Sequence, residues 1–242
     1  MTRIKTAVVT GANKGIGFEI ARRLASEGYR VWLGARDQSR GEAAAARLKA
    51  EGFDAHWLEL DVTDDSSVAD AAKALAGQTG TLDALVNNAG IADGFGISPL
   101  DEPIGITKNV YEVNVFGPIR VTQAFLPLLK ASGAGRIVMM SSELGSIQSL
   151  LDPDNEFYAV NALGYNSSKS ALNAATVSFA KAAEPFSIKI NAADPGYTAT
   201  EMNGNSGYRT VEEAAEVAVK LATLGEDGPT AGYFNHNGVL PW

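Results

Sequence analysis

The chain has 242 residues, of which 45% are hydrophobic, and a formal net charge of −8. This length and apolar content predict one large α/β domain over residues 1–242, with enough apolar side chains for a sizeable core. The acidic balance, and the lack of any run of basic residues longer than two, argue against nucleic acid or an anionic membrane surface as a partner.

Two residue types that often carry chemistry are scarce. The sequence contains no cysteine, which excludes disulfides, thiolate chemistry and cysteine zinc sites. His56 and His236 are the only histidines and lie far apart, so we expect neither a metal site nor a Ser-His-Asp triad. No apolar stretch approaches the ~20 residues of a membrane span, and residues 1–5 lack the apolar core of a signal peptide. We therefore expect a soluble, cytoplasmic protein.

The first segment has the pattern of a strand, a glycine-rich turn and a helix. Thr6–Thr10 reads as a short buried strand, residues 11–17 have the spacing G-x-x-x-G-x-G, and a helical run extends over residues 18–27. Glycines let a backbone approach a pyrophosphate, and a helix N-terminus offers N–H donors and positive partial charge. The segment therefore predicts a dinucleotide phosphate site, with a plain turn as the alternative. Its residues are Gly11, Asn13, Lys14, Gly15, Ile16 and Gly17.

The second predicted strand, residues 30–34, ends beside Arg36 and Asp37. A carboxylate at such a strand tip commonly binds the ribose 2′-hydroxyl of NAD, whereas cations suit the 2′-phosphate of NADP. Arg36 and Lys14 supply two cations, so the sequence favours NADPH over NADH. Asp37 leaves the preference open, and both cations could instead be solvated surface charges.

The remaining segments continue the alternation of strands and helices. We expect helices at residues 38–51, 63–76, 108–130 and 211–224, a long helix containing Tyr165, and strands at 54–60, 84–87, 136–140, 187–193 and 232–235. This pattern predicts a parallel sheet with helices on both faces. Ligands of such sheets bind beyond the carboxyl ends of the strands. The residues expected there are Gly11–Gly17, Arg36, Asp61, Asn88, Ser142 and Pro195–Thr200.

Tyr165 and Lys169 are four positions apart in a predicted helix, so their side chains share one face. A phenol titrates near pH 10, and a nearby cation favours the phenolate. Lowering the pKa by about three units requires about 4 kcal/mol, which an ammonium and a positive cofactor ring could together supply in a partly desolvated site. The alternative is a surface Tyr and Lys one turn apart.

Pro118 lies inside the predicted helix over residues 108–130. Proline has no N–H, so the carbonyl of Asn114, four residues earlier, loses its helical partner. We expect that carbonyl to hold a structural water, with a plain proline kink as the alternative.

Together these motifs resemble the short-chain dehydrogenase/reductase family over nearly the whole chain. The asparagine and lysine in the glycine turn, Arg36 with its neighbours, and the C-terminal Trp242 are similar to the carbonyl reductase-like group. The motifs that carry the resemblance are Thr10–Gly17, Asn87–Gly90, Asn114, the pair Ser141 and Ser142, Tyr165 with Lys169, and Pro195–Thr200.

The resemblance implies a Rossmann-type, doubly wound sheet of about seven parallel strands and reversible, NADPH-dependent reduction of a ketone or aldehyde. Tyr165 would give the proton and Ser142 would orient the carbonyl oxygen. Lys169 would bind the nicotinamide ribose and lower the pKa of Tyr165, and Asn114 would hold a water leading to solvent. No metal is implied. The cofactor contacts implied are Gly11, Asn13, Lys14, Gly15, Ile16, Gly17, Arg36, Asp61, Val62, Asn88, Tyr165, Lys169, Pro195, Gly196, Thr198 and Thr200.

The spacing of 23 positions between Ser142 and Tyr165 is longer than is usual in the family. The additional residues, roughly 148–163, would wall the substrate pocket and affect assembly, so we expect a monomer or a homodimer. Arg209 is the one basic residue expected near an acidic substrate. An apolar wall would comprise Phe95, Leu150, Phe157, Tyr197, Met202 and Trp242.

Two other functions compete with reduction. A sensor that binds NADP without turnover would generally lose the Tyr or the Lys, and both are present here. Epimerase or dehydratase chemistry on the same four residues would need an additional C-terminal substrate domain, for which the chain is too compact.

Overall fold

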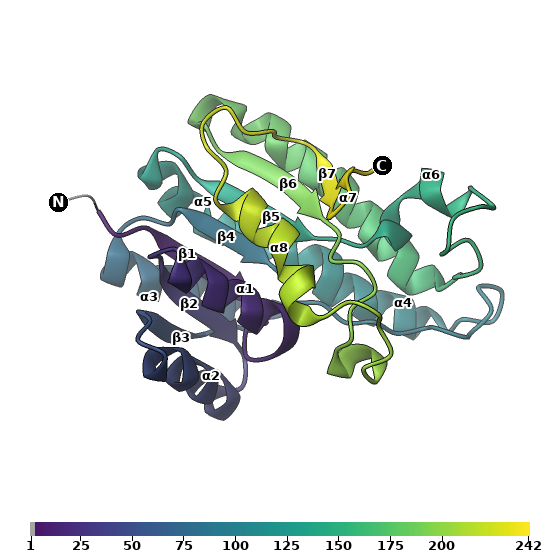
Figure 1. The fold of residues 1–242 in the computed structure, drawn as a ribbon, viewed down its shortest axis with the longest axis horizontal. Helices are drawn as coiled ribbons and strands as arrows, with labels where there is room; N and C mark the ends of the chain where they lie inside the picture. Colours follow the sequence, from purple (N-terminus) through teal and green to yellow (C-terminus); the bar gives the residue numbers. More distant parts are fainter. Residues whose placement is uncertain (1–2) are drawn as a thin grey trace.

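The computed structural model describes residues 3–242, which form one sheet with helices on both faces (Figure 1). The eight strands in this part of the chain follow the order β3-β2-β1-β4-β5-β6-β7-β8. β1 to β7 pair in parallel, and β8 pairs with β7 in the antiparallel direction. The architecture is thus the expected doubly wound α/β sheet, with one antiparallel edge strand that the sequence did not predict.

Every predicted strand is present, with ends shifted by at most two residues. β1 and β5 are buried along their whole length because helices cover both faces of the sheet. The strands are β1 (Thr6–Thr10), β2 (Arg30–Ala35), β3 (Ala55–Glu59), β4 (Ala84–Asn87), β5 (Arg136–Met140), β6 (Lys189–Ala193), β7 (Tyr233–Asn235) and β8 (Gly238–Val239).

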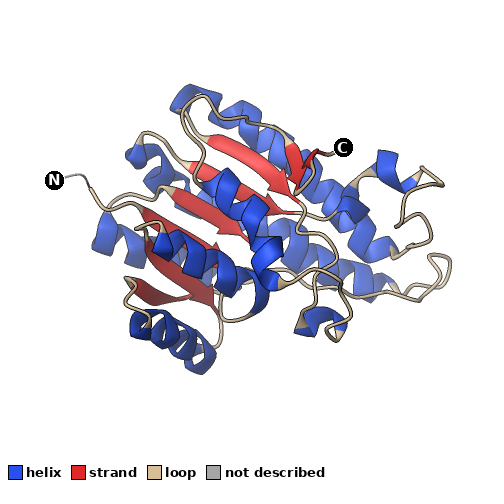
Figure 2. Ribbon diagram, viewed as in Figure 1, coloured by secondary structure: helices blue, strands red, loops and turns tan. Residues whose placement is uncertain are grey.

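The helices that cross between the strands lie in two layers (Figure 2). Asp37, Asp64 and Thr210 each begin a helix by accepting a backbone N–H on the side chain, as N-cap residues do. The α-helices are α1 (Gly15–Ser26), α2 (Gln38–Ala50), α3 (Asp65–Thr79), α4 (Ile104–Tyr111), α5 (Gly117–Ser132), α6 (Ile147–Leu150), α7 (Leu163–Ala183) and α8 (Val211–Ala222), and the short helices are η1 (Glu112–Phe116), η2 (Glu143–Gly145), η3 (Glu184–Phe186) and η4 (Glu201–Asn203).

The sheet separates two apolar cores. Ala7 and Val9 of β1 pack into the core that α1 and α8 cover, whereas Val8 packs into the core beneath α3, α5 and α7. Successive side chains of a strand point to opposite faces, so one apolar strand supplies both cores. This burial on both faces holds the strand ends, and the loops that follow them, in fixed positions.

The helix predicted over residues 108–130 is present within a helical segment from Ile104 to Ser132, but it is not α-helical throughout. The segment consists of α4, the π-helix η1 and α5, and in η1 the N–H of Gly117 bonds to the carbonyl of Glu112 five residues back. Pro118 therefore lies in the first turn of α5, where its missing N–H leaves no gap in the helix. The extra residue of the π turn is accommodated around Asn114, and such turns are frequent at functional sites.

Candidate active site

The carboxyl ends of β4, β5 and β6 point to the same edge of the sheet, at the right of Figure 1, where α7 also begins. Asn88 follows β4, Ser142 follows β5, and the turn at Pro195 follows β6. Tyr165 lies in the first turn of α7 and Lys169 in the second. The fold thus gathers, at one edge, residues that are up to about a hundred positions apart in the chain.

Tyr165 and Lys169 lie on the same face of α7. The Lys169 Nζ is 5.6 Å from the centre of the Tyr165 ring and donates a hydrogen bond of 2.8 Å to the carbonyl of Met140 at the end of β5. Lys169 is only 6% exposed. At Gly145, any Cβ would lie 2.7 Å from the Lys169 Cβ, so a glycine is required for the loop after β5 to approach the helix this closely.

The electrostatics of this pair differ from the expectation. Burial raises the pKa of Tyr165 to about 12, although a hydrogen bond with Ser142 acts in the opposite direction. Burial also lowers the pKa of Lys169 to about 8. The expected lowering of the Tyr165 pKa is therefore wrong for the protein by itself, because both groups lose water when they are buried.

The two serines after β5 have different surroundings. Ser141 faces the interior, where its Oγ lies 2.6 Å from Oδ1 of Asn173. Ser142 is half-buried, begins η2, and accepts a hydrogen bond from the N–H of Leu144 at 3.3 Å. Of the two hydroxyls, that of Ser142 acts on the phenol of Tyr165 and is partly exposed.

Asn114 joins the loop after β4 to the helix of Tyr165. Its Oδ1 accepts from the N–H of Ile91, and its Nδ2 donates to the carbonyl of Ile91, both at 2.9 Å. Nδ2 also lies 3.2 Å from the Oγ of Ser168, the neighbour of Lys169 in sequence. The side chain is 1% exposed, so these bonds fix it firmly. A water on the carbonyl of Asn114 stays a prediction.

The glycine turn fits a pyrophosphate. Helix α1 has no side-chain cap at Lys14, so the N–H groups of its first turn are available to an anion. Gly11 has a φ of +63°, and an added Cβ would lie 2.9 Å from the Cα of Ala89. Asn88 supports the turn from below, because its Nδ2 donates to the carbonyls of Thr10 and Gly11 at 2.9 and 3.3 Å. Asn88 therefore holds the backbone of the turn itself.

Cations gather at the other end of this turn. Lys14, Arg40 and Arg47 line a groove of about 310 Å³ between the turn, α2 and η4, together with Asn13, Ala43, Ala44 and Glu201. Arg36 is exposed at the end of β2. Arg40, in the first turn of α2, was not among the predicted cofactor residues.

Asp37 has a structural partner. Its Oδ1 accepts the N–H of Arg40 at 2.8 Å and caps α2. This bond is the usual one for an N-cap aspartate, and it occupies one of the two carboxylate oxygens. The side chain that left the choice of cofactor open is therefore engaged with the backbone of α2.

The other predicted cofactor residues reach the same edge, but many of their polar atoms bond locally. Asp61 accepts from the N–H of Thr63 at 3.0 Å, and Val62 is buried. In the turn after β6, the Thr198 Oγ1 donates to the carbonyl of Gly196 at 3.0 Å, and to that of Pro195 at 3.3 Å. The Thr200 N–H donates to Oδ1 of Asn203 at 3.1 Å.

Arg209 supports this turn. Its backbone carbonyl accepts from the N–H of Ala199 at 2.9 Å, and its guanidinium donates to the carbonyl of Glu213 at 3.0 Å. A Cβ on Gly196 would lie 2.5 Å from the Arg209 Cδ. The arginine that was expected near an acidic substrate thus packs beneath the turn.

Three residues of the predicted apolar wall pack against other aromatic rings, and one of these rings is Tyr165. The Phe95 ring centre is 5.2 Å from that of Tyr165, and Phe95 is 48% exposed. Tyr197 packs edge-on against Tyr208 at 5.8 Å, and Trp242 stacks on Tyr233 at 5.4 Å. Tyr197 and Trp242 of the predicted wall are thus exposed near aromatic partners, and the sequence analysis missed Tyr208.

Comparison with known proteins places the chain among oxidoreductases. The family model for the short chain dehydrogenase matches residues 5–210. The (+)-neomenthol dehydrogenase of Arabidopsis thaliana is 35% identical, over 94% of this chain and 94% of that protein. Salutaridine reductase of Papaver bracteatum is 33% identical, over 97% of this chain and 95% of that protein. The chain belongs to the short-chain dehydrogenase/reductase family.

Solved structures refine this assignment. The NADPH-bound carbonyl reductase from chicken fatty liver is 30% identical, covers 100% of both chains and superposes with a TM-score of 0.86. The carbonyl reductase Sniffer of D. melanogaster is 26% identical over 100% of both chains, also with a TM-score of 0.86. This short-chain dehydrogenase/reductase is of the carbonyl reductase type, an NAD(P)-dependent oxidoreductase of carbonyl and alcohol groups.

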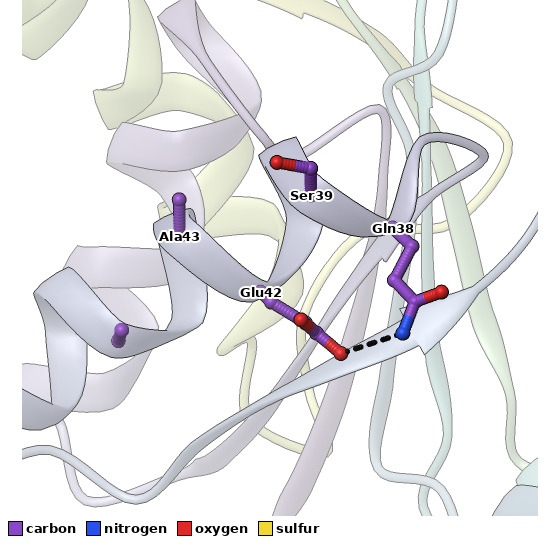
Figure 3. A pocket seen from close by; sticks show the side chains of 5 residues that line it. Gln38, Ser39, Glu42 and Ala43 are labelled. Atoms are coloured by element: carbon purple, nitrogen blue, oxygen red, sulfur yellow. Dashed lines mark hydrogen bonds between the residues drawn. The ribbon is translucent and has the colours of Figure 1, made fainter.

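Outside the site, the surface of this oxidoreductase has a further hollow. Figure 3 shows a hollow on the outer face of α2, where Gln38 Nε2 donates to Glu42 Oε1 at 2.9 Å. The hollow is lined by α2 alone, and we assign it no role in the reaction. Between residues 3 and 242, no helix combines the length and the apolar character needed to cross a membrane.

Proposed function

We propose that this protein reduces a ketone or aldehyde to the alcohol with NADPH, and catalyses the reverse oxidation. The observation that carries the proposal is the arrangement of Tyr165, Lys169 and Ser142, with the ammonium 5.6 Å from the tyrosine ring and the Ser142 hydroxyl close enough to the phenol to act on its pKa against the effect of burial. In this proposal residues 1–242 act as one catalytic domain.

Bound NADPH supplies a hydride to the carbonyl carbon, which leaves negative charge on the carbonyl oxygen. The hydroxyls of Ser142 and Tyr165 stabilise that oxygen, and Tyr165 gives up its proton to it. With a pKa of about 12 the phenol is protonated at neutral pH, the state that a proton donor needs. Lys169, with a pKa of about 8, is mostly charged at pH 7 and stabilises the phenolate that remains.

Asn114 is proposed to complete the route by which the proton is replaced. Its side chain is fixed by Ile91, and the π-helix η1 that contains it packs against α7. A water on this carbonyl would connect Lys169 with solvent. The role of Asn114 is therefore to hold a water and, through Ser168, to position the helix.

Cofactor binding is assigned to the remaining residues of the same edge. Gly11, Asn13, Gly15, Ile16 and Gly17 would hold the pyrophosphate at the uncapped start of α1. The adenosine part would be held by Asp61, Val62 and Asn88. The nicotinamide part would be held by Pro195, Gly196, Thr198 and Thr200.

The preference for NADPH rests on the charges at the ribose. Lys14 and Arg40 line one groove, Arg36 is exposed at the strand tip, and Asp37 is engaged as a helix cap. Cations are suited to a 2′-phosphate, and a carboxylate that already caps a helix is a weaker competitor for a ribose hydroxyl. The NADPH-bound carbonyl reductase from chicken supports the same choice.

The substrate is proposed to be a largely apolar, ring-containing carbonyl compound. The exposed face of Phe95 offers apolar area beside the proton donor, and Tyr197 and Trp242 of the predicted wall are also partly exposed. The names of the relatives, neomenthol dehydrogenase and salutaridine reductase among them, agree with such a substrate. Burial of an apolar ring against these side chains would supply binding energy without any charged contact.

The test is the oxidation of NADPH and of NADH by the purified protein, against a panel of apolar ketones, aldehydes and a quinone. Turnover with NADPH and little with NADH is expected. Turnover chiefly with NADH would assign the ribose to Asp37 and overturn the cofactor preference. Tight binding of NADPH without turnover on any member of the panel would favour the sensor, which is the competing function.

A further inference from the structure

Lys14 and Glu201 form an ion pair that joins two distant segments. The Nζ of Lys14 lies 2.5 Å from Oε2 of Glu201, and the two residues are 187 positions apart. Lys14 belongs to the glycine turn after β1. Glu201 begins η4 in residues 198–209, which we call the flap, and whose ends are joined where Thr198 pairs with Arg209.

Glu201 is the one carboxylate in the groove of cations. Lys14, Arg40 and Arg47 line this groove with it. The Lys14 hydrogen bond, and the charges of Lys14 and Arg40, hold the pKa of Glu201 below its usual range. Its carboxylate therefore faces the same cations that the 2′-phosphate of the cofactor is proposed to face.

We infer that Glu201 is a specificity-determining residue, which competes with the 2′-phosphate for Lys14 and Arg40. The inference rests on the proposed function, in that the cofactor carries this phosphate. A phosphate and a carboxylate repel each other, so both cannot occupy the groove at full charge. A ligand with the phosphate displaces Glu201, whereas a ligand without it leaves the ion pair intact.

The flap has a second anchor, which stays intact when a phosphate displaces Glu201 from Lys14. The Tyr208 hydroxyl donates to the two carboxylate oxygens of Glu156 at 3.0 and 3.1 Å, and Glu156 belongs to the additional residues before α7. The hydroxyls of Tyr197, just before the flap, and of Ser206 within it share a hydrogen bond of 2.6 Å. Displacement of Glu201 thus frees only the part of the flap around η4, while Tyr208 stays attached to Glu156.

The first experiment measures ligand affinity without turnover. Titration calorimetry with adenosine 2′-monophosphate, adenosine 5′-monophosphate, NADPH and NADH compares the wild type with Glu201→Gln. Loss of a competing exposed ion pair should tighten binding of the two 2′-phosphate ligands by about two- to fivefold, with little change for the other two. The matched control is Glu184→Gln, which removes the same charge at the far end of α7 and should change none of the four affinities.

A double-mutant cycle isolates the pair. In a Lys14→Ala background, Glu201→Gln should have a smaller effect on the affinity for adenosine 2′-monophosphate than in the wild type, because the main competitor contact is already absent. Equal effects in both backgrounds, or a Glu201→Gln variant that binds all four ligands as the wild type does, would overturn the inference.

Hydrogen exchange of the flap gives an independent readout. The backbone N–H of Asn205 donates to the carbonyl of Thr200 at 2.8 Å, and that of Asn203 donates to the same carbonyl at 3.2 Å. These amides should exchange faster in unliganded Glu201→Gln than in the unliganded wild type, because the anchor at Lys14 is lost. Unchanged exchange would show that the pair does not hold the flap.

The outcomes separate this inference from the proposed function. A wild type that binds NADPH more tightly than NADH, together with an inert Glu201→Gln, keeps the proposed cofactor and rejects the role of Glu201. A Glu201→Gln variant that binds adenosine 2′-monophosphate more tightly, in a protein that turns over no carbonyl compound, supports the role of Glu201 and rejects the proposed reaction.

Discussion

The ammonium of Lys169 lies 5.6 Å from the centre of the Tyr165 ring, one helical turn along α7. The carbonyl of Met140, at the end of the neighbouring strand β5, accepts its hydrogen bond at 2.8 Å. The lysine is therefore held in place by the sheet before any ligand binds. A cation fixed in this way stabilises a phenolate without moving, which is the condition for electrostatic preorganisation.

The first prediction concerns the proton donor. Tyr165→Phe removes the hydroxyl but keeps the ring against Phe95, so NADPH should still bind while kcat falls by about 10²- to 10⁴-fold. Steady-state kinetics and a fluorescence titration with NADPH measure the two effects. Tyr158→Phe is the matched control, because Tyr158 is exposed and has an alanine four residues on; activity equal to wild type in Tyr165→Phe would rule out the proposed donor.

The second prediction concerns the buried carboxylate of Asp194, which is 4% exposed and accepts the N–H of Gly196 at 3.1 Å. Burial raises its pKa to about 6, against an ordinary value of 3.8. The folded state thus binds the proton more tightly, and the stability that this provides is present below pH 4 and lost as the pH rises to 6. Asp194→Asn should therefore unfold with a free energy up to about 3 kcal/mol higher than wild type at pH 7, and with little difference at pH 4.

The same substitution should alter the pH profile of activity. The negative charge of Asp194 raises the pKa of Lys169 against the effect of burial, so its loss should move the alkaline limb to lower pH. The other ionisable groups around Asp194 are Glu143, Arg209, Tyr165, Tyr208 and Tyr233. Urea unfolding at both pH values, and kcat over pH 6–10, check the prediction. A less stable Asp194→Asn at pH 7 with an unshifted profile would contradict it.

The third prediction separates two roles of Asp37. If this residue serves α2 alone, Asp37→Ala loses the cap and should lower the free energy of unfolding by about 1 kcal/mol. Asp37→Asn keeps an equally good cap and removes the charge, so it should leave stability and the affinity for NADH unchanged. Denaturant unfolding and NADH titration of both variants are the measurements. A clear loss of NADH affinity in Asp37→Asn would instead assign the carboxylate to the ribose.

The fourth prediction concerns the apolar wall. Phe95 is half-exposed, and its ring lies 5.2 Å from that of Tyr165, so a ring-containing substrate should contact it. Phe95→Ala should raise KM for apolar ketones by about tenfold, in line with the loss of 1–2 kcal/mol of apolar contact, and should leave the affinity for NADPH unchanged. Leu100→Ala serves as the control, since Leu100 is almost fully exposed on the same loop. A Phe95→Ala variant with unchanged KM for every ketone would remove Phe95 from the wall.

Much of the fold could be predicted because it depends on local pattern. The apolar strands, the glycine turn after Thr10 and the helical spacing of Tyr165 and Lys169 are properties of neighbouring residues, and the structure contains all three. The resemblance to the family added the expected role of each residue in the reaction. The π turn at Asn114 was not predictable in the same way, because the helix-forming propensity of residues 108–130 does not show where five of them adopt π geometry.

The tertiary structure decided which residues of distant segments contact one another. Whether Tyr165 has a raised or a lowered pKa depends on how much water the surrounding loops exclude, which no local pattern encodes. The contact of Lys14 with Glu201 joins positions 187 apart. The sequence by itself thus determined which side chains could do the chemistry and along which helix or turn they stand. Only the folded chain determined their charges and their neighbours. Desolvation and ion pairing depend on residues that are distant in sequence and come into contact only in the folded sheet.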